Sequence, residues 1–171
     1  MWWGIVEQLG TAGDARWGPL PEERLFPMLL GEYAQKLDEK NRVTVPARLR
    51  APFGDGLFLT RGLDRCVALY ARDGWDDFVA AQTARLDPLT REGRQLERFL
   101  FGGAVEAELD RQGRVAVPAP LMQHASLARE IVVVGVRDRL EIWDRGAWEL
   151  GLAELEGSAE VVAERLVRDA R

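Results

Sequence analysis

The pattern of hydrophobic and polar positions repeats along the chain at a distance of 72 residues. Residues 37–49 read LDEKNRVTVPARL and residues 109–121 read LDRQGRVAVPAPL, so that eight of the thirteen positions are identical. The similarity continues after a shift of one residue, where Trp75 corresponds to Trp148. A similarity of this length indicates an internal duplication, and we expect two copies of a unit of roughly 50 residues.

Each copy is predicted to contain a strand that leads into a tight turn. Residues 32–37 have the pattern of the strand, and residues 38–41 have the composition of the turn. The last turn position is Asn41 in the first copy and Gly113 in the second, and both residue types tolerate a positive φ. The repeated unit is therefore expected to be built around a reversal of the chain.

The four residues after the turn, RVTV in the first copy, alternate between polar and apolar side chains. In a strand this alternation points the valines inward and points Arg42 and Thr44 outward. Pro46, and Pro118 in the second copy, suits the first position of a short helix because proline lacks the N–H that would be unpaired there.

Further strands are predicted at four places, which are residues 57–60, 66–70, 131–136 and 140–143. A helix is expected from Trp75 to Leu86, where the apolar residues follow a helical period. Asp87 and Pro88 suit the cap and the first turn of a second helix. A third helix is expected from Trp148 to Leu155.

These elements predict an α+β fold that is mainly β, with two tandem units and short flanking helices. Because neither unit alone has much of a core, the two units are expected to pack together. We expect five segments: an extension (residues 1–27), a first repeat (28–75), a helical connector (76–102), a second repeat (103–149) and a C-terminal helical tail (150–171).

The composition removes several classes of protein from consideration. With 47% hydrophobic and 30% charged residues among 171, the chain has the composition of a globular protein. One cysteine excludes an internal disulfide framework, and a single histidine removes most metal sites and Ser-His-Asp triads. No apolar run approaches the roughly 20 residues of a membrane span, so no membrane association is expected.

The charge balance is unfavourable for a nucleic-acid partner, because the net charge is −5. The cations are nevertheless concentrated in one place. The first copy has Lys36, Lys40, Arg48 and Arg50, where the second copy has Glu108, Gln112, Pro120 and Met122. If one face of the molecule binds DNA, the first copy is expected to dominate that face.

Several motifs together resemble a known family. They are the doubled Asp-x-x-x-Arg signature at Asp38/Arg42 and Asp110/Arg114, the segment GEYA at 31–34, VPA at 45–47, TRGLD at 60–64 and FLFGGAV at 99–105. From Met28 to about Glu149 the chain resembles the MraZ family of bacterial transcriptional regulators, which are built from two units of the AbrB/SpoVT type.

This resemblance implies a small β-barrel of the swapped-hairpin kind, formed by the two repeats of one chain. It implies a homo-oligomer in the form of a ring, which binds double-stranded DNA at G-rich direct repeats upstream of its own operon for division and cell-wall functions. Such a protein acts mostly as a repressor, is cytoplasmic and nucleoid-associated, needs no cofactor and is not an enzyme.

The candidate DNA-binding residues follow from the outward-facing cations and the motif. They are Arg42, Lys40, Lys36, Arg48, Arg50 and Arg114. An arginine fork matches the O6 and N7 acceptors of guanine. Asp38 and Asp110 have the wrong sign for a phosphate contact, and we interpret them as groups that brace the turn or the arginine.

Two alternatives stay open for these residues. Each Asp-x-x-x-Arg could be only an ion pair that closes the turn, and the four cations of the first copy could be solvated surface charges. The concentration of cations in the first copy predicts that Arg42→Ala weakens DNA binding far more than Arg114→Ala.

The first 27 residues precede the part that resembles the family. Their prolines, scattered glycines and lack of periodicity predict disorder. A second hypothesis is that Met28 is the native start and that this segment is translated operator DNA. Trp3-Gly4 and Trp17-Gly18 are both encoded by TGGGGN, and they lie 14 codons apart.

Two other classes of function are alternatives. The acidic tail, with Val161, Val162 and Leu166, could bind a protein partner, which would make the chain an antitoxin-like or scaffold module. A self-processing enzyme on a related barrel would need a Gly-Ser site within the barrel, and the Gly-Ser pair of this chain is Gly157-Ser158 in the tail.

Overall fold

The computed structural model describes residues 28–169, so both hypotheses about residues 1–27 lie outside the described residues. In the described part, six strands form one antiparallel sheet in the order β1-β7-β8-β4-β3-β5, and β2 and β6 form a second sheet. The strands are β1 (Leu29–Lys36), β2 (Arg42–Thr44), β3 (Leu57–Arg61), β4 (Val67–Ala71), β5 (Val105–Ala107), β6 (Arg114–Ala116), β7 (Glu130–Arg137) and β8 (Leu140–Asp144).

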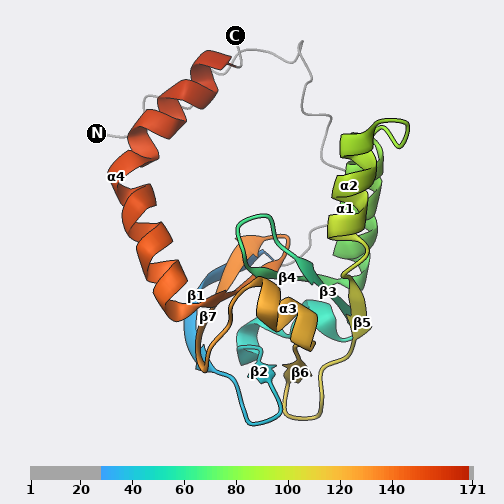
Figure 1. Cartoon of the computed structure of the whole chain (residues 1–171). Helices are drawn as coiled ribbons and strands as arrows, with labels where there is room; N and C mark the ends of the chain where they lie inside the picture. The colour runs from blue at the N-terminus through green and yellow to red at the C-terminus, as the bar shows by residue number, and fades with distance from the viewer. Residues whose placement is uncertain (1–27, 170–171) are drawn as a thin grey trace, which may run out of the picture.

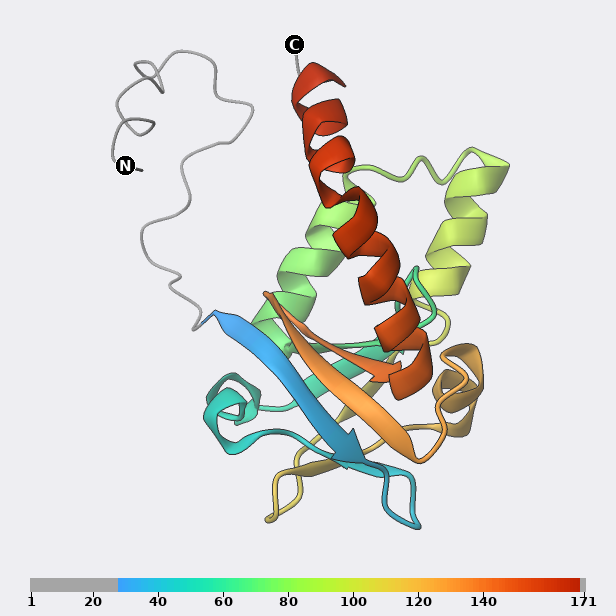
Figure 2. The same cartoon turned by 90° about the vertical axis from the view of Figure 1, so that its left-hand side faces the viewer.

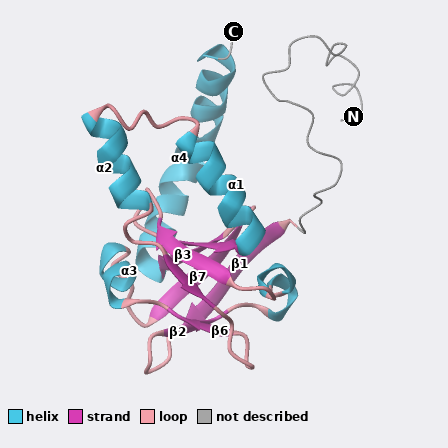
Figure 3. Cartoon of the chain, turned by 90° about the vertical axis from the view of Figure 1, so that its right-hand side faces the viewer, coloured by secondary structure: helices cyan, strands magenta, loops and turns pink. Residues whose placement is uncertain are grey.

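The helices are gathered mainly at one end of the molecule. They are α1 (Arg72–Thr83), α2 (Arg91–Leu100), α3 (Ala119–His124) and α4 (Arg145–Asp169), together with two 3-10 turns, Ala47–Leu49 and Ala51–Phe53. Figures 1 and 3 show α1, α2 and α4 rising from one end of the sheet, while the turns before β2 and β6 project from the opposite end. One end of the molecule is therefore formed by long helices and the other by two turns.

The two repeats are interleaved in the sheets. β1 of the first repeat pairs along its whole length with β7 of the second, from Leu29 opposite Arg137 to Lys36 opposite Glu130. β5 of the second repeat pairs with β3 of the first, and β2 pairs with β6. Figure 2 shows β1 and β7 lying side by side across the front of the sheet. The predicted mainly β α+β fold with two tandem units is confirmed.

The core lies between the two sheets and is made of apolar side chains from both repeats. Val43 and Val115, opposite each other in β2 and β6, are buried, as are Leu59, Leu69 and Ile131 of the large sheet. The prediction from the alternation after each turn is confirmed, since the valines lie in the core while Arg42, Thr44, Arg114 and Ala116 are partly or fully exposed.

The prolines after β2 and β6 lie one residue earlier than predicted. Pro46 and Pro118 are the residues that precede the 3-10 turn and α3, with ψ angles of 134° and 145° that continue the extended chain. Their fixed φ suits this position as well as the first helical one, and helical geometry begins at the next residue.

The start of α2 also differs from the prediction. Asp87 does not cap α2; its Oδ1 accepts a hydrogen bond from the Leu89 N–H at 2.8 Å and closes a separate turn. Thr90 is the cap, because its hydroxyl accepts from the Gly93 N–H at 3.0 Å. Aspartate and threonine both favour helix starts, and here Thr90, the later of the two residues, sets the start of α2.

The C-terminal part of the described chain is one continuous helix. α4 contains both the helix predicted from Trp148 to Leu155 and the acidic stretch after it. It packs on β7 and β8 near its start and then extends away from the body, as Figure 2 shows. No helix in residues 28–169 is long and apolar enough to cross a membrane.

Candidate nucleic-acid interface

Two equivalent hairpin turns lie side by side at the end of the molecule that is opposite the long helices. The strands that follow the two turns, β2 and β6, pair with each other, with Arg42 opposite Ala116 and Thr44 opposite Arg114. The turns themselves adopt the positive φ predicted for their last residues, 56° at Asn41 and 74° at Gly113. The two copies of the motif are thus related by an approximate two-fold axis between the central valines.

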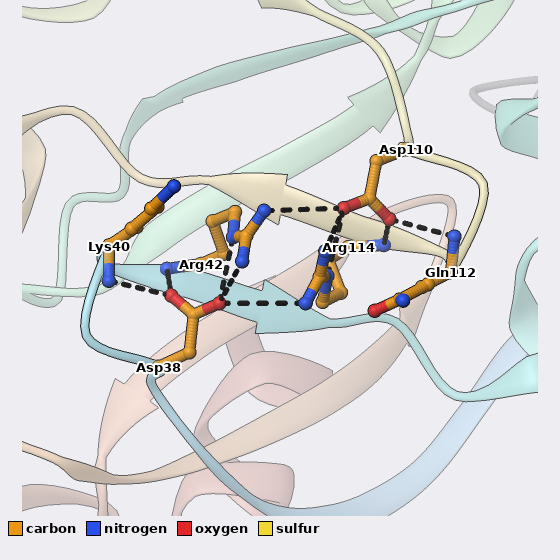
Figure 4. Close-up of polar contacts among 6 residues, drawn as sticks. All are labelled: Asp38, Lys40, Arg42, Asp110, Gln112 and Arg114. Atoms are coloured by element: carbon orange, nitrogen blue, oxygen red, sulfur yellow. Dashed lines mark hydrogen bonds and ion pairs between the residues drawn. The ribbon is translucent and has the colours of Figure 1, made fainter.

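One carboxylate oxygen of each aspartate organises its own turn. Asp38 Oδ1 accepts hydrogen bonds from the backbone N–H groups of Lys40 and Arg42, at 2.9 and 3.0 Å. Asp110 Oδ1 accepts from Gln112 and Arg114 at the same distances. These bonds are drawn in Figure 4, and they explain why an aspartate opens both copies of the motif.

The other carboxylate oxygen holds the arginine four residues on. Asp38 Oδ2 lies 2.7 Å from both Nε and Nη2 of Arg42, and Asp110 Oδ2 lies 2.8 and 2.7 Å from the same atoms of Arg114. Figure 4 shows how the two pairs face each other across the strands. The cross distances are longer, 3.6 Å from Arg42 Nη1 to Asp110 and 3.8 Å from Arg114 Nη1 to Asp38.

The hydrogen bonds stabilise the charged form of both aspartates. The side-chain bond from Arg42, followed by the backbone bond from Arg42, lowers the pKa of Asp38 to about 2. The corresponding bonds from Arg114 lower the pKa of Asp110 to about 2. The pKa of Arg42 is raised by its bond to Asp38. At neutral pH the cluster therefore consists of two carboxylates and two guanidinium groups.

The bracing leaves part of each guanidinium available. Nε and Nη2 are committed to the aspartate, whereas Nη1 makes only the longer cross contact. The side chains of Arg42 and Arg114 are 28% and 24% exposed. Each arginine is thus held in a fixed orientation with N–H donors that can still bind an acceptor outside the protein.

The tips of the turns carry two exposed cations. Lys40 and Arg111 are exposed, and neither side chain makes a hydrogen bond or ion pair within residues 28–169. Lys40 is among the candidates predicted from the sequence, but Arg111 is not. Arg111 could have been predicted from its position directly after Asp110, because the residue after the aspartate lies at the tip of the turn.

The other three candidate cations are engaged by neighbouring groups. Lys36 Nζ forms a 2.8 Å ion pair with Glu130, its partner across the β1–β7 ladder. Arg48 donates to the hydroxyl of Tyr33 and lies 4.8 Å from the centre of its ring. The structure therefore does not gather these two with the cations at the turn tips.

Arg50 has a role between the repeats. Its Nε donates to the carbonyl oxygen of Val45 at 2.7 Å, and its guanidinium packs directly against the Cα of Gly113, where a Cβ would lie 2.2 Å from Arg50 Cζ. Gly113 is therefore required for space as well as for its positive φ. Arg50 ties the first repeat to the turn of the second.

His124 and Cys66, the histidine and the cysteine of the chain, are both engaged within the fold. His124 Nε2 is hydrogen-bonded to the carbonyl of Gly62 at 2.9 Å, and Cys66 is buried, which raises the pKa of its thiol to about 12. Among residues 28–169 there is no group of three or more His, Cys, Asp or Glu side chains placed to hold a metal ion.

The fold and this site define a class of protein: two interleaved strand–turn–strand repeats in one chain that present paired, arginine-bearing turns at one end. The chain matches the family model described as "MraZ protein, putative antitoxin-like" in two consecutive stretches, residues 28–99 and 100–169. The chain therefore belongs to the MraZ family.

Curated relatives cover most of the chain. The Transcriptional regulator MraZ of Moorella thermoacetica is 43% identical over 141 residues, which are 82% of this chain and 97% of the relative. The proteins of the same name from Thermoanaerobacter pseudethanolicus and Natranaerobius thermophilus are 38% and 40% identical, over 81% and 82% of this chain and 96% and 97% of their own lengths. None of these names is that of an enzyme, in agreement with the expectation from the sequence.

Proposed function

We propose that this protein is a sequence-specific DNA-binding transcriptional regulator. In this proposal it represses its own division and cell-wall operon by binding G-rich direct repeats upstream as an oligomeric ring. The names of the relatives support the regulator. The observation that carries the DNA contact is the pair of projecting turns in which aspartates orient two arginines while Nη1 of each makes no hydrogen bond.

The proposed contacts divide into two kinds. Arg42 and Arg114 present fixed N–H donors, and a guanidinium fork fits the O6 and N7 acceptors of guanine, so these residues supply the preference for G-rich DNA. Lys40 and Arg111, at the exposed tips, contact phosphates, which position the protein and carry no sequence information. Lys36, Arg48 and Arg50 are each paired with a group of the same chain, so we propose no direct DNA contact for them.

Assembly is part of the proposal because of the charge. A chain with a net charge of −5 that offers four cations at one end gains little from a single encounter with DNA. A ring that presents several copies of the paired turns to consecutive repeats adds weak contacts through effective concentration. One subunit alone is expected to bind poorly.

The test is a titration of the full chain on a duplex from the DNA upstream of its own gene. Fluorescence anisotropy is measured over a salt series, with a duplex of the same composition and shuffled sequence as the control. The proposal predicts tighter binding to the upstream duplex, and an affinity that falls steeply with salt. Equal affinity for both duplexes would overturn it.

A second candidate function is an antitoxin-like module that binds a protein partner, and two observations favour it. The description of the family model includes that term, and α4 exposes several apolar side chains beyond the body. In that case the turns would be structural only. The same titration separates the two functions, because a protein-binding module has no preference for the upstream duplex.

A further inference from the structure

The two projecting turns have equivalent hydrogen bonds but differ in the residues at their tips. The first turn has Glu39 and Lys40, and the second has Arg111 and Gln112 at the equivalent positions. Figure 4 shows Lys40 and Gln112 at corresponding places on the two turns. The second turn therefore has an uncharged polar side chain where the first has a cation.

Gln112 combines a fixed backbone with a free side chain. Its backbone N–H donates to Asp110 Oδ1 at 2.9 Å, and the next residue, Gly113, lies against the guanidinium of Arg50. The Gln112 side chain is exposed, and its carboxamide makes no hydrogen bond within residues 28–169. One acceptor and one amino donor are thus presented at the tip of the turn and are available to a group outside the chain.

A single carboxylate fixes the position of Gln112 relative to Arg114. Asp110 Oδ1 accepts from both backbone N–H groups, at 2.9 Å from Gln112 and 3.0 Å from Arg114. Asp110 Oδ2 holds Nε of Arg114 at 2.8 Å. Because Arg114 is proposed above to contact a guanine, a base that Gln112 contacts is a neighbour of that guanine.

The chemistry of the carboxamide favours one base. Glutamine binds adenine through two hydrogen bonds in the major groove, since its oxygen accepts from the N6 amino group and its amino group donates to N7. A neutral side chain gains little from the charge of the phosphates, which attract lysine and arginine. A contact between Gln112 and DNA is therefore most useful at the edge of a base.

We infer that Gln112 selects adenine at a base pair next to the guanine that Arg114 contacts. The inference rests on the proposed DNA-binding function and adds one base to its site. The first turn has Lys40 at the equivalent position and no such preference. The two turns of one chain therefore read different sequences, although an approximate two-fold axis relates them.

The other exposed carboxamide of these turns, Asn41, is explained by the backbone. Its φ is 56°, a conformation that asparagine tolerates, and its counterpart Gly113 has a φ of 74°. Gln112 has no such backbone requirement, because the positive φ of its turn falls on Gly113. Asn41→Gly removes a carboxamide from the first turn without straining its backbone, and it is the matched control for Gln112→Ala.

The test measures how each base pair of the upstream DNA contributes to binding. The full chain is mixed with a pool of upstream duplexes in which every base pair is substituted in turn, and sequencing of the bound fraction gives relative affinities. For the wild type we expect losses at guanines and a loss of about tenfold at an adenine beside one of them. Gln112→Ala should bind equally with or without that adenine and keep the losses at guanines, whereas Asn41→Gly should behave like the wild type. Circular dichroism and melting temperature verify that both variants fold.

Replacement of that adenine by 7-deazaadenine isolates the contact, because it removes the N7 acceptor and keeps the base pair. In anisotropy titrations the wild type should bind this duplex several-fold more weakly than the parent duplex, and Gln112→Ala should bind the two equally. The salt dependence of binding should be the same for both proteins, since the substitution removes no charge.

The pattern of losses separates this inference from the proposed function. If no adenine beside a guanine matters to the wild type, or if Gln112→Ala has the same pattern as the wild type, the inference is overturned and the regulator stands. Loss of the adenine preference in Asn41→Gly alone would assign it to the wrong turn and also overturn the inference. A wild type that is indifferent to every base pair, guanines included, would overturn the regulator together with the inference.

Discussion

The Asp38–Arg42 and Asp110–Arg114 pairs orient two guanidinium groups without occupying all of their donors. Each aspartate divides its oxygens, with Oδ1 closing the turn and Oδ2 holding Nε and Nη2 of the arginine. The type and position of these residues could be predicted from the repeated motif. The contact between Arg50 and Gly113 could not, because it joins residues of different repeats that only the folded chain brings together.

The depressed pKa values of the two aspartates predict an acid-dependent loss of stability. Both values are about 2 in the folded protein, below the ordinary 3.8, so the ionised carboxylates stabilise the fold fully above about pH 4 and lose this effect as the pH falls towards 2. Urea unfolding of the wild type and of Asp38→Asn/Asp110→Asn is compared between pH 6 and pH 3. The stability difference should be largest near neutral pH and shrink in acid. A difference that does not change with pH would contradict this interpretation.

The equivalence of the two pairs changes an expectation drawn from the sequence. Arg42 and Arg114 have the same partners at distances that agree within 0.1 Å for the short bonds. The cations of the first copy suggested that this copy contributes more to DNA binding, but three of them, Lys36, Arg48 and Arg50, are paired with groups of their own chain. The structure therefore predicts similar effects for the two arginines, where cation counts alone predict that Arg42 dominates.

Arg42→Ala and Arg114→Ala should each weaken binding to the upstream duplex by roughly tenfold or more, since a guanine contact is worth about 1–3 kcal/mol. Anisotropy titrations measure both variants, and melting temperatures verify their folds. Arg42→Lys and Arg114→Lys, which keep the charge and lose the fork, should recover only part of the loss. A large effect at Arg42 with none at Arg114 would restore the unequal interpretation.

At the scale of elements, local pattern predicts which segments are strands but not how the strands pair. The alternation around Val43 and the β-branched run in β7 identify two strands. The local sequence does not predict that β1 pairs with β7 of the other repeat, because both repeats contain strands with the same pattern. The prediction of a helix boundary is wrong where two candidate capping residues compete, as Asp87 and Thr90 do before α2.

The β1–β7 pairing can be tested at Gly135, where the two strands lie close together. At Gly135 an added Cβ would lie 2.6 Å from the backbone carbon of Leu29, so Gly135→Ala must push β1 away from β7. We expect a loss of about 1–3 kcal/mol in the free energy of unfolding. Gly157→Ala is the control: nothing lies within 4 Å of that position in α4, and alanine favours helix by about 1 kcal/mol. Urea denaturation should separate the two, and a neutral Gly135→Ala would mean that the strands are not in this register.

The two ends of the whole molecule differ in the proposed function. In the proposed function the turns before β2 and β6 present their arginines to DNA, and Figure 1 shows α1, α2 and α4 at the other end of the molecule. A negative net charge is compatible with DNA binding at the turns, because α4, which carries several glutamates, lies at the end of the molecule away from them.

One matched comparison of charge reversals tests whether the paired turns are the surface that contacts DNA. Lys40→Glu/Arg111→Glu changes the turn tips, and Arg91→Glu/Arg98→Glu makes the same change on the exposed face of α2 at the opposite end. Affinity for the upstream duplex is measured by anisotropy at one fixed salt concentration. We expect a loss of at least tenfold for the turn variant and little change for the α2 variant. Equal losses, or a turn variant that binds like the wild type, would contradict it.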